Sequence, residues 1–201
     1  GLALPGSAGA PAPYESRDQY AEASGRAVMA LLENNLRPRD IVTMKALENA
    51  AVIVAATGGS TNAGLHLPAM AHEAGLRFTM HDVLEIMRRT PTIADLKPAG
   101  KYVALDVYNV GGIPVIIKSL LDGGLLHGDC ITISGQTIAE VLKDIADVPR
   151  ADQDVIRPIT NPMYQQGHLA ILKGNLSPEG CVAKITGLKK PVMTGPARVF
   201  D

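Results

Sequence analysis

The sequence has 201 residues, of which 46% are hydrophobic and only 3% aromatic, and its formal net charge is −1. This composition indicates a globular protein with an aliphatic core, and the lack of a basic excess argues against nucleic acid or an anionic membrane as a partner. No apolar stretch reaches the roughly 18 residues of a membrane-spanning helix, no secretory signal is present, and two distant cysteines make a disulfide framework improbable, so a cytoplasmic protein is expected.

The N-terminal part of the chain is predicted to be a loop followed by an amphipathic helix. Residues 1–13 are rich in Gly, Pro and Ala and cannot form a long helix. In residues 15–34 apolar side chains recur at helical spacing, and Asn34, Asn35 and Pro38 end the pattern. The residues predicted to share the buried face are Tyr20, Ala23, Ala27, Val28 and Leu31.

Two helices are predicted on either side of a glycine turn in residues 51–75. The first helix is expected to begin well before residue 51, with Thr43 as its cap. Its Val-Ile-Val content also fits a buried strand, but helix is favoured because no breaker occurs before Gly58. Thr61 or Asn62 can cap the second helix, which runs over residues 63–74. Both helices are apolar almost all round, so both are expected to be buried.

Two further helices follow the pair around the turn. Thr79 and Asp82 have capping-box spacing and open a helix that ends near Thr90. After Gly111 and Gly112, apolar residues follow the helical template closely. The residues predicted to face inward in this second helix are Ile113, Ile116, Ile117, Leu120 and Leu121.

The periodicity changes after Gly128, and a domain boundary is predicted within residues 123–128. Residues 131–134 fit a short strand, and Thr137 with Glu140 forms a capping box before a helix that turns Ile138, Val141, Leu142 and Ile145 inward. Residues 168–172 and 181–186 are predicted strands, and residues 174–175 and 177–180 are predicted turns.

The turn over residues 57–62 is the best candidate site. Glycines let a backbone approach a ligand closely, and the apolar segments on both sides would hold the turn rigid. The turn lacks the lysine of a P-loop, and neither a GxGxxG motif nor a GxSxG elbow occurs. Two interpretations stay open: a ligand contact, or a joint that caps the neighbouring helices.

The histidines and cysteines do not predict a metal site. His66 and His72 lie six residues apart, which places them about 240° apart around a helix. No HExxH or CxxC spacing occurs, so Cys130 and Cys181 are expected to be small core residues. His66, just behind the turn, is the histidine best placed for a substrate contact, and the alternative is a buried histidine with satisfied hydrogen bonds.

Several long blocks resemble the dihydroxy-acid dehydratase / phosphogluconate dehydratase family. In chain order they are LPGSAGAPA, ENAAVIVAATGGSTNAGLHLPAMAHEAG, ADLKPAGKY, GGIPVIIKSLLDGGLLHGD, KGNLSPEGCVAKITG and TGPARVFD. They cover essentially all 201 residues and are most similar to dihydroxy-acid dehydratases. The resemblance implies the loss of water from a small 2,3-dihydroxy acid, giving a 2-keto acid.

The resemblance also implies cofactors and residues that this sequence does not carry. The family uses an iron–sulfur cluster as a Lewis acid on the leaving hydroxyl, a Mg²⁺ ion that holds the substrate, and a serine base. The cysteine blocks, the Cys-Asp-Lys block and the serine block of the family are absent. The chain is therefore expected to be an internal piece of a longer protein, cut at both ends, with no metal ligand and no catalytic residue, and to be inactive and iron-free alone.

The resemblance assigns an α/β fold class. Residues 1–126 would be the helix-rich end of the metal-carrying α/β domain, and residues 127–201 the start of a β-barrel-like domain. The turn would face the cleft, with Gly58, Gly59, Ser60, Thr61, Asn62 and His66 as substrate-binding residues. A homodimer or a dimer of dimers in the cytoplasm is implied. The alternatives are a sugar-acid dehydratase and a non-catalytic binding or structural piece, whose exposed apolar faces would promote aggregation.

Overall fold

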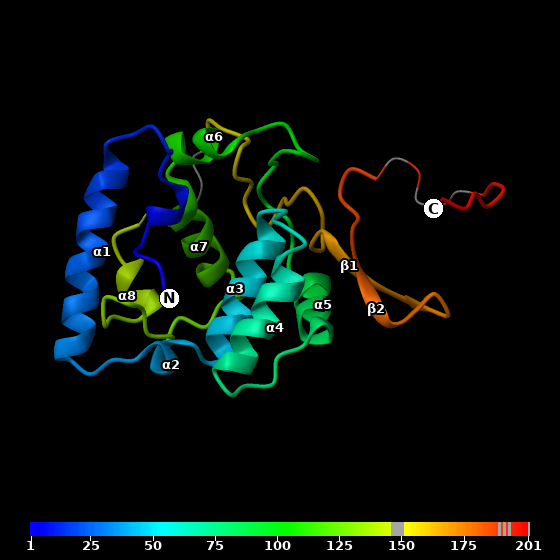
Figure 1. The fold of residues 1–201 in the computed structure, drawn as a ribbon. Helices are drawn as coiled ribbons and strands as arrows, with labels where there is room; N and C mark the ends of the chain where they lie inside the picture. The colour runs from blue at the N-terminus through cyan, green and yellow to red at the C-terminus, as the bar shows by residue number, and fades with distance from the viewer. Residues whose placement is uncertain (146–150, 189, 191, 193, 201) are drawn as a thin grey trace.

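A body of helices followed by one β-hairpin makes up the described part of the chain (Figure 1). The computed structural model describes residues 1–145, 151–188, 190, 192 and 194–200. The elements are η1 (Ser7–Gly9), α1 (Ser16–Glu33), α2 (Pro38–Ile41), α3 (Met44–Ala56), α4 (Ala63–Glu73), α5 (Met80–Arg89), α6 (Ala104–Asn109), α7 (Gly112–Asp122), α8 (Ile138–Val141), β1 (Leu169–Gly174) and β2 (Ser177–Lys184). The predicted mixed α/β class, helical first and β afterwards, is confirmed.

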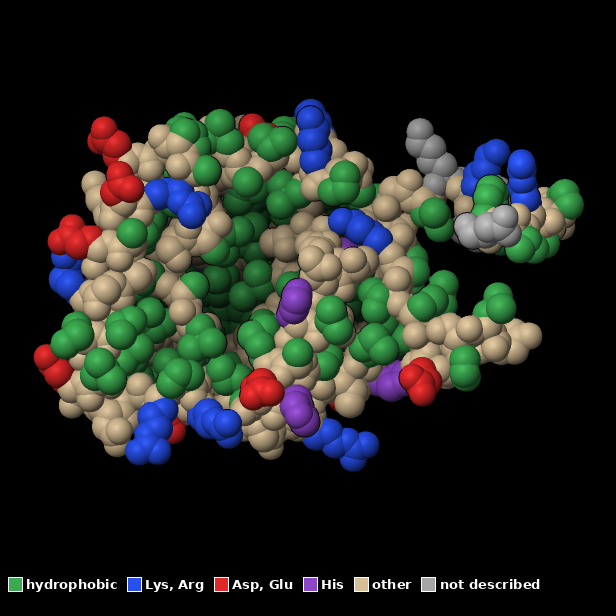
Figure 2. Space-filling model, viewed as in Figure 1, with side chains coloured by type: hydrophobic (Ala, Val, Ile, Leu, Met, Phe, Trp, Pro, Cys, Tyr) green, Lys and Arg blue, Asp and Glu red, His purple; other side chains and the backbone are tan. Residues whose placement is uncertain are grey.

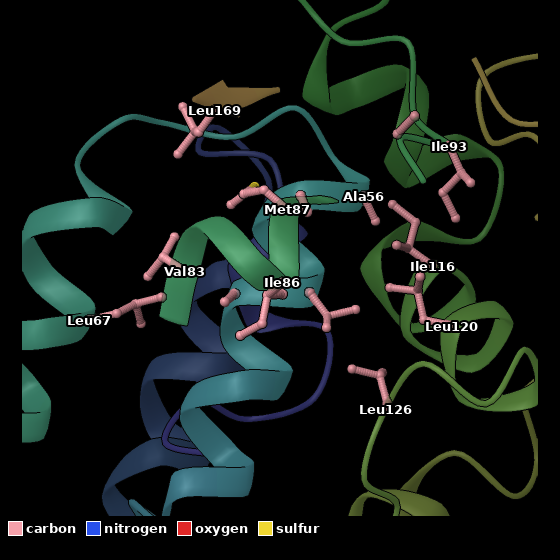
Figure 3. Packing of buried hydrophobic residues seen from close by; sticks show 14 of the residues in the cluster. Ala56, Leu67, Val83, Ile86, Met87, Ile93, Ile116, Leu120, Leu126 and Leu169 are labelled. Carbon is pink, nitrogen blue, oxygen red and sulfur yellow. The ribbon is translucent and has the colours of Figure 1, made fainter. Parts of the chain in front are cut away.

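Helix α3 is at the centre of the helical body and contacts α4, α5 and α7. Its alanines at positions 51, 55 and 56 are completely buried, and their small side chains let the neighbouring helices approach closely. Figure 3 shows the core around them, with Met87 from α5 and Ile116 and Leu120 from α7. The close packing around α3 therefore depends on its small side chains.

The predicted helix starts are largely confirmed. Thr43 caps α3 by accepting a hydrogen bond from the N–H of Ala46. Thr79 and Asp82 form the predicted capping box of α5, and the burial there lies on one side of the helix, at Val83, Ile86 and Met87. The short helices α2 and α6 were not predicted, because four and six residues are too few to show a hydrophobic period.

The expectation that α4 is buried is wrong. Leu65 and Met70 are 68% and 43% exposed, and only Gly64, Leu67 and Ala71 are buried. Helix α1 likewise leaves Val28 half exposed, against the prediction, although Tyr20, Ala23, Ala27 and Leu31 are partly covered. These helices are apolar on more sides than the described chain covers.

Three predictions after residue 128 need correction. Residues 131–134 form no strand, because the hydrogen bond from the N–H of Thr132 to the carbonyl of Gln136 turns the chain back on itself. Helix α8 ends at Val141, so Ile145 lies outside it. The predicted turn at residues 177–180 lies within β2, and the hairpin instead turns between Gly174 and Ser177.

The segment before the hairpin packs into the helical core. Val155, Ile156 and Leu169 belong to the same buried cluster as α3, α5 and α7. The backbone of this segment also forms hydrogen bonds with the helical part, for example from the N–H of Gly167 to the carbonyl of Met87 at 2.6 Å. The residues on both sides of the change in periodicity therefore share one core.

The surface carries a hollow with a hydrophobic floor between α3 and α7 (Figure 2). Its volume is about 150 Å³, and side chains of α3, α7, α8 and the N-terminal loop line it. Among the helices that the structure describes, each is too short or too polar to cross a lipid bilayer.

Candidate functional site

The predicted glycine turn closes the C-terminal end of α3. Gly58 has a φ of +60°, the left-handed conformation that glycine adopts without strain. The N–H of Gly58 donates to the carbonyl of Ala55 at 3.4 Å, and the N–H of Gly59 donates to that of Val54 at 3.0 Å. This is the Schellman arrangement of a helix end. The capping interpretation is thus confirmed for the two glycines, whose N–H groups are occupied within the protein.

The next three residues use their carbonyls to start α4 but keep several other hydrogen-bonding groups free. The hydroxyl of Ser60 accepts a hydrogen bond from the N–H of Asn62 at 3.2 Å. Within the described residues, no partner meets the N–H groups of Ser60 and Thr61, the Thr61 hydroxyl or the Asn62 side chain. Asn62 is the N-cap residue of α4, one of the two predicted positions, but no side-chain hydrogen bond caps the helix there. Free donors and acceptors are thus concentrated at these three residues.

His66 lies one turn of α4 beyond Asn62. The N–H of His66 donates to the carbonyl of Asn62 at 2.8 Å, so the two residues share one side of the helix. The His66 side chain is exposed, and the alternative of a buried histidine is therefore wrong. Ser60, Asn62 and His66 together form an exposed polar edge at the N-terminal end of α4.

Lys184, at the end of β2, contacts the turn and was missed by the sequence analysis. Its ammonium donates to the carbonyls of Gly58 at 3.0 Å and Gly59 at 3.3 Å. A lysine near a helix C-terminus is favoured because the last carbonyls carry partial negative charge. Only the alternation within β2, which puts Val182 and Lys184 on one face, could have indicated this role.

His168 is the most buried titratable residue near the turn, with no exposed surface. Neither ring nitrogen has a hydrogen-bond partner among the described residues. Burial, and secondarily the charge of Lys184, lower the pKa of His168 from 6.5 to about 4. The imidazole is therefore neutral at physiological pH. The sequence analysis placed this residue at the start of a strand and did not single it out.

The space immediately beside Gly58 is small. A cavity of about 20 Å³ lies there, lined among others by Thr92, Asp95 and Tyr164. That volume has room for about one water molecule. A substrate at this turn would therefore have to lie on the exposed side of Ser60 and Asn62.

The other histidine and cysteine side chains form no metal site in the described ranges. No group of three or more His, Cys, Asp or Glu residues that could hold a metal ion occurs there. Cys130 is buried as expected, and burial raises the pKa of its thiol. Cys181 is exposed, so the expectation that it is a core residue is wrong. The imidazole of His127 lies 2.6 Å from a carboxylate oxygen of Glu48, and Asn49 binds the His127 backbone, so this cluster joins α3 to the loop after α7.

Comparison with known proteins defines the class. The model described as dihydroxy-acid/6-phosphogluconate dehydratase N-terminal matches residues 1–141, and the corresponding C-terminal model matches residues 154–201. The chain therefore belongs to the dihydroxy-acid/6-phosphogluconate dehydratase family, as the sequence blocks predicted.

The sequence is also highly identical to individual proteins of this family. The chain is 61% identical over its whole length to a dihydroxy-acid dehydratase of Polaromonas sp. (strain JS666 / ATCC BAA-500), and 62% identical over its whole length to one of Parvibaculum lavamentivorans. It is 59% identical to a protein named dihydroxy-acid dehydratase 2 of Bradyrhizobium diazoefficiens. The chain spans 36%, 35% and 35% of the lengths of these relatives, about a third of each.

Proposed function

We propose that this chain works as part of a hydro-lyase that converts a 2,3-dihydroxy acid into a 2-keto acid, as in branched-chain amino acid biosynthesis. The observation that carries the proposal is the identity of about 60% over the whole chain with proteins named dihydroxy-acid dehydratase. The family name also includes 6-phosphogluconate dehydratase, which favours a sugar acid as the second candidate substrate.

The reaction sets the demands on the protein. A proton leaves C2, the hydroxyl on C3 leaves with its bonding electron pair, and the resulting enol takes up a proton to become the keto acid. Groups that hold the carboxylate and the C2 hydroxyl in place raise the rate by orienting the substrate. The free N–H groups and hydroxyls of Ser60 and Thr61, the amide of Asn62 and the ring of His66 are suited to that task, while Gly58 and Gly59 shape the turn.

The metal groups are proposed to be held by other parts of the full-length protein. The family resemblance implies an iron–sulfur cluster and Mg²⁺, but the described residues offer no matching set of ligands. This chain is therefore assigned to substrate contact alone. A homodimeric or dimer-of-dimers assembly, a cytoplasmic location and the division into domains at residues 126 and 127 belong to the same proposal.

The proposal is tested by comparing the full-length protein with the 201-residue chain. The full-length protein, purified without oxygen, is expected to contain iron and acid-labile sulfide and to release a 2-keto acid from 2,3-dihydroxyisovalerate faster than from 6-phosphogluconate. The 201-residue chain is expected to contain no iron and to be inactive. A full-length protein that is free of iron, or that prefers the sugar acid, would contradict this assignment.

The role of the turn is tested by Ser60→Ala combined with Asn62→Ala in the full-length protein. Loss of two hydrogen bonds, each worth about 1 kcal/mol net, is expected to raise KM about thirtyfold. Steady-state kinetics measures this. The matched control combines Asn175→Ala with Ser177→Ala at the tip of the hairpin, where KM is expected to stay the same. Unchanged kinetics in the first variant, with unchanged thermal stability, would show that the turn only caps α3.

A further inference from the structure

Strand β2 contacts the turn on both sides of its free polar groups. Leu169 pairs with Lys184 and Ile171 with Val182 across the hairpin. Because paired residues of two strands point to the same side, Lys184 and Val182 share the face on which Leu169 enters the core. One strand therefore presents two side chains to the region between α3 and α4.

The first contact, made by Lys184, involves the two residues that precede Ser60 in the chain. The carbonyls of Gly58 and Gly59 accept hydrogen bonds from the Lys184 ammonium. These two carbonyls follow directly after the last helical turn of α3, where no N–H of the helix can reach them. A single ammonium donates to both, which fixes the orientation of two successive peptide planes immediately before Ser60.

The second contact, made by Val182, involves a residue that follows Asn62 in the chain. Gly64, in the first turn of α4, is buried against Val182. A Cβ atom added at Gly64 would lie 3.1 Å from a methyl group of Val182, so the Val182 side chain would have to move by a few tenths of an ångström. The start of α4 is thus held against β2 at a close backbone approach.

We propose that β2 positions Ser60, Thr61 and Asn62, with Lys184 as the positioning residue, so that the C-terminal hairpin sets the geometry of the substrate-binding turn. This inference rests on the proposed function of the turn. Lys184 itself points to the two carbonyls and acts through the turn. The substrate class concerned is the carboxylate and hydroxyl end of a dihydroxy acid.

Kinetics on the full-length protein tests the inference with Lys184→Met, which keeps the apolar stem and removes the donor. KM is expected to rise about tenfold with kcat changed less than about twofold, the pattern of lost substrate binding. Lys184→Arg still carries donors for both carbonyls, and its KM is expected to stay within about threefold of the original. Lys173→Met on the exposed part of the same hairpin is the matched control, with no expected change.

A double-mutant cycle separates action through the turn from a general loss of structure. In the background that carries Ser60→Ala and Asn62→Ala, the change Lys184→Met is expected to raise KM less than about twofold further, because the side chains that it positions are already removed. A full tenfold further rise would show that Lys184 acts independently of the turn and would overturn the inference.

Hydrogen exchange supplies a readout that does not depend on activity. Lys184→Met is expected to speed exchange in residues 59–64, whereas Lys173→Met leaves it unchanged. Unchanged exchange there overturns the inference. If Ser60→Ala with Asn62→Ala leaves KM unchanged, the proposed function of the turn fails, and the exchange result still decides the positioning role. Should Lys184→Met not fold, Val182→Ala takes its place, with the same acceleration expected.

Discussion

Acidification from pH 6.5 to pH 4 is expected to lower the free energy of unfolding by about 3 kcal/mol through His168 alone. The folded protein keeps this imidazole neutral down to a pKa of about 4, whereas in the unfolded chain it titrates near 6.5. Between these values the unfolded state binds one more proton than the folded state. The stability contributed by the neutral form is therefore complete above pH 6.5 and is lost as the pH falls.

Two capping carboxylates, those of Asp82 and Glu140, titrate in a lower window. Hydrogen bonds from Thr79 and Thr137 hold the pKa values of Asp82 and Glu140 below their usual values of 3.8 and 4.5. The stability that these carboxylates contribute is lost only as the pH falls through those values. The loss of stability expected from His168 therefore begins at a higher pH than the loss expected from these two carboxylates.

Urea unfolding at a series of pH values measures the effect. The variant His168→Leu is expected to remove a slope of up to about 1.4 kcal/mol per pH unit, and His168→Gln, which keeps a polar side chain, removes it as well. His72→Gln on the exposed face of α4 is the control and keeps the slope. If His168→Leu retained the full slope, the pKa of His168 would not be lowered in the folded protein.

Truncation of Ile116 to alanine is expected to cost about 4 kcal/mol of unfolding free energy. Ile116 has no exposed surface and lies on the face of α7 that meets the central cluster, as Figure 3 shows. The variant loses the transfer energy of three carbon atoms and leaves a cavity among well-packed neighbours. Alanine's better helix propensity returns only about 0.5 kcal/mol.

Denaturant midpoints at fixed pH measure this cost. Ile131→Ala provides a control with the same change of side chain at a site that is 39% exposed, and about 1 kcal/mol or less is expected there. A loss at Ile116 no larger than that at Ile131 would show that α7 does not pack as described.

The helices that the sequence predicted best are those with a cap and a long apolar period. Thr79 with Asp82 marked the start of α5, and Ile116 and Leu120 marked the inner face of α7. The strand predicted at residues 131–134 failed because its apolar residues alternate within a hydrogen-bonded loop. Pro178 and Gly180 suggested a turn but lie in a two-stranded sheet, where both strands are edges and a missing donor is tolerated.

The candidate site was predictable only in its local part. The glycines of the turn and the helix on each side follow from adjacent residues. The contact from Lys184 to Gly58 joins positions 126 residues apart, and no local sequence pattern indicates it. His66 was predicted to contact substrate, with burial as the alternative, and the structure removes that alternative by leaving the side chain exposed.

The core shared by residues 155–169 and the central helices has an evolutionary consequence. The two family models match residues 1–141 and 154–201, and the interval between these segments would be the obvious place to join parts of two relatives. Yet Ile93 and Ile156 are both completely buried in one cluster, and the carbonyl of Ile93 binds the N–H of Arg157. A chimera of two relatives joined between these segments would combine two halves of one interior that did not evolve together, and it is expected to be less stable than either relative.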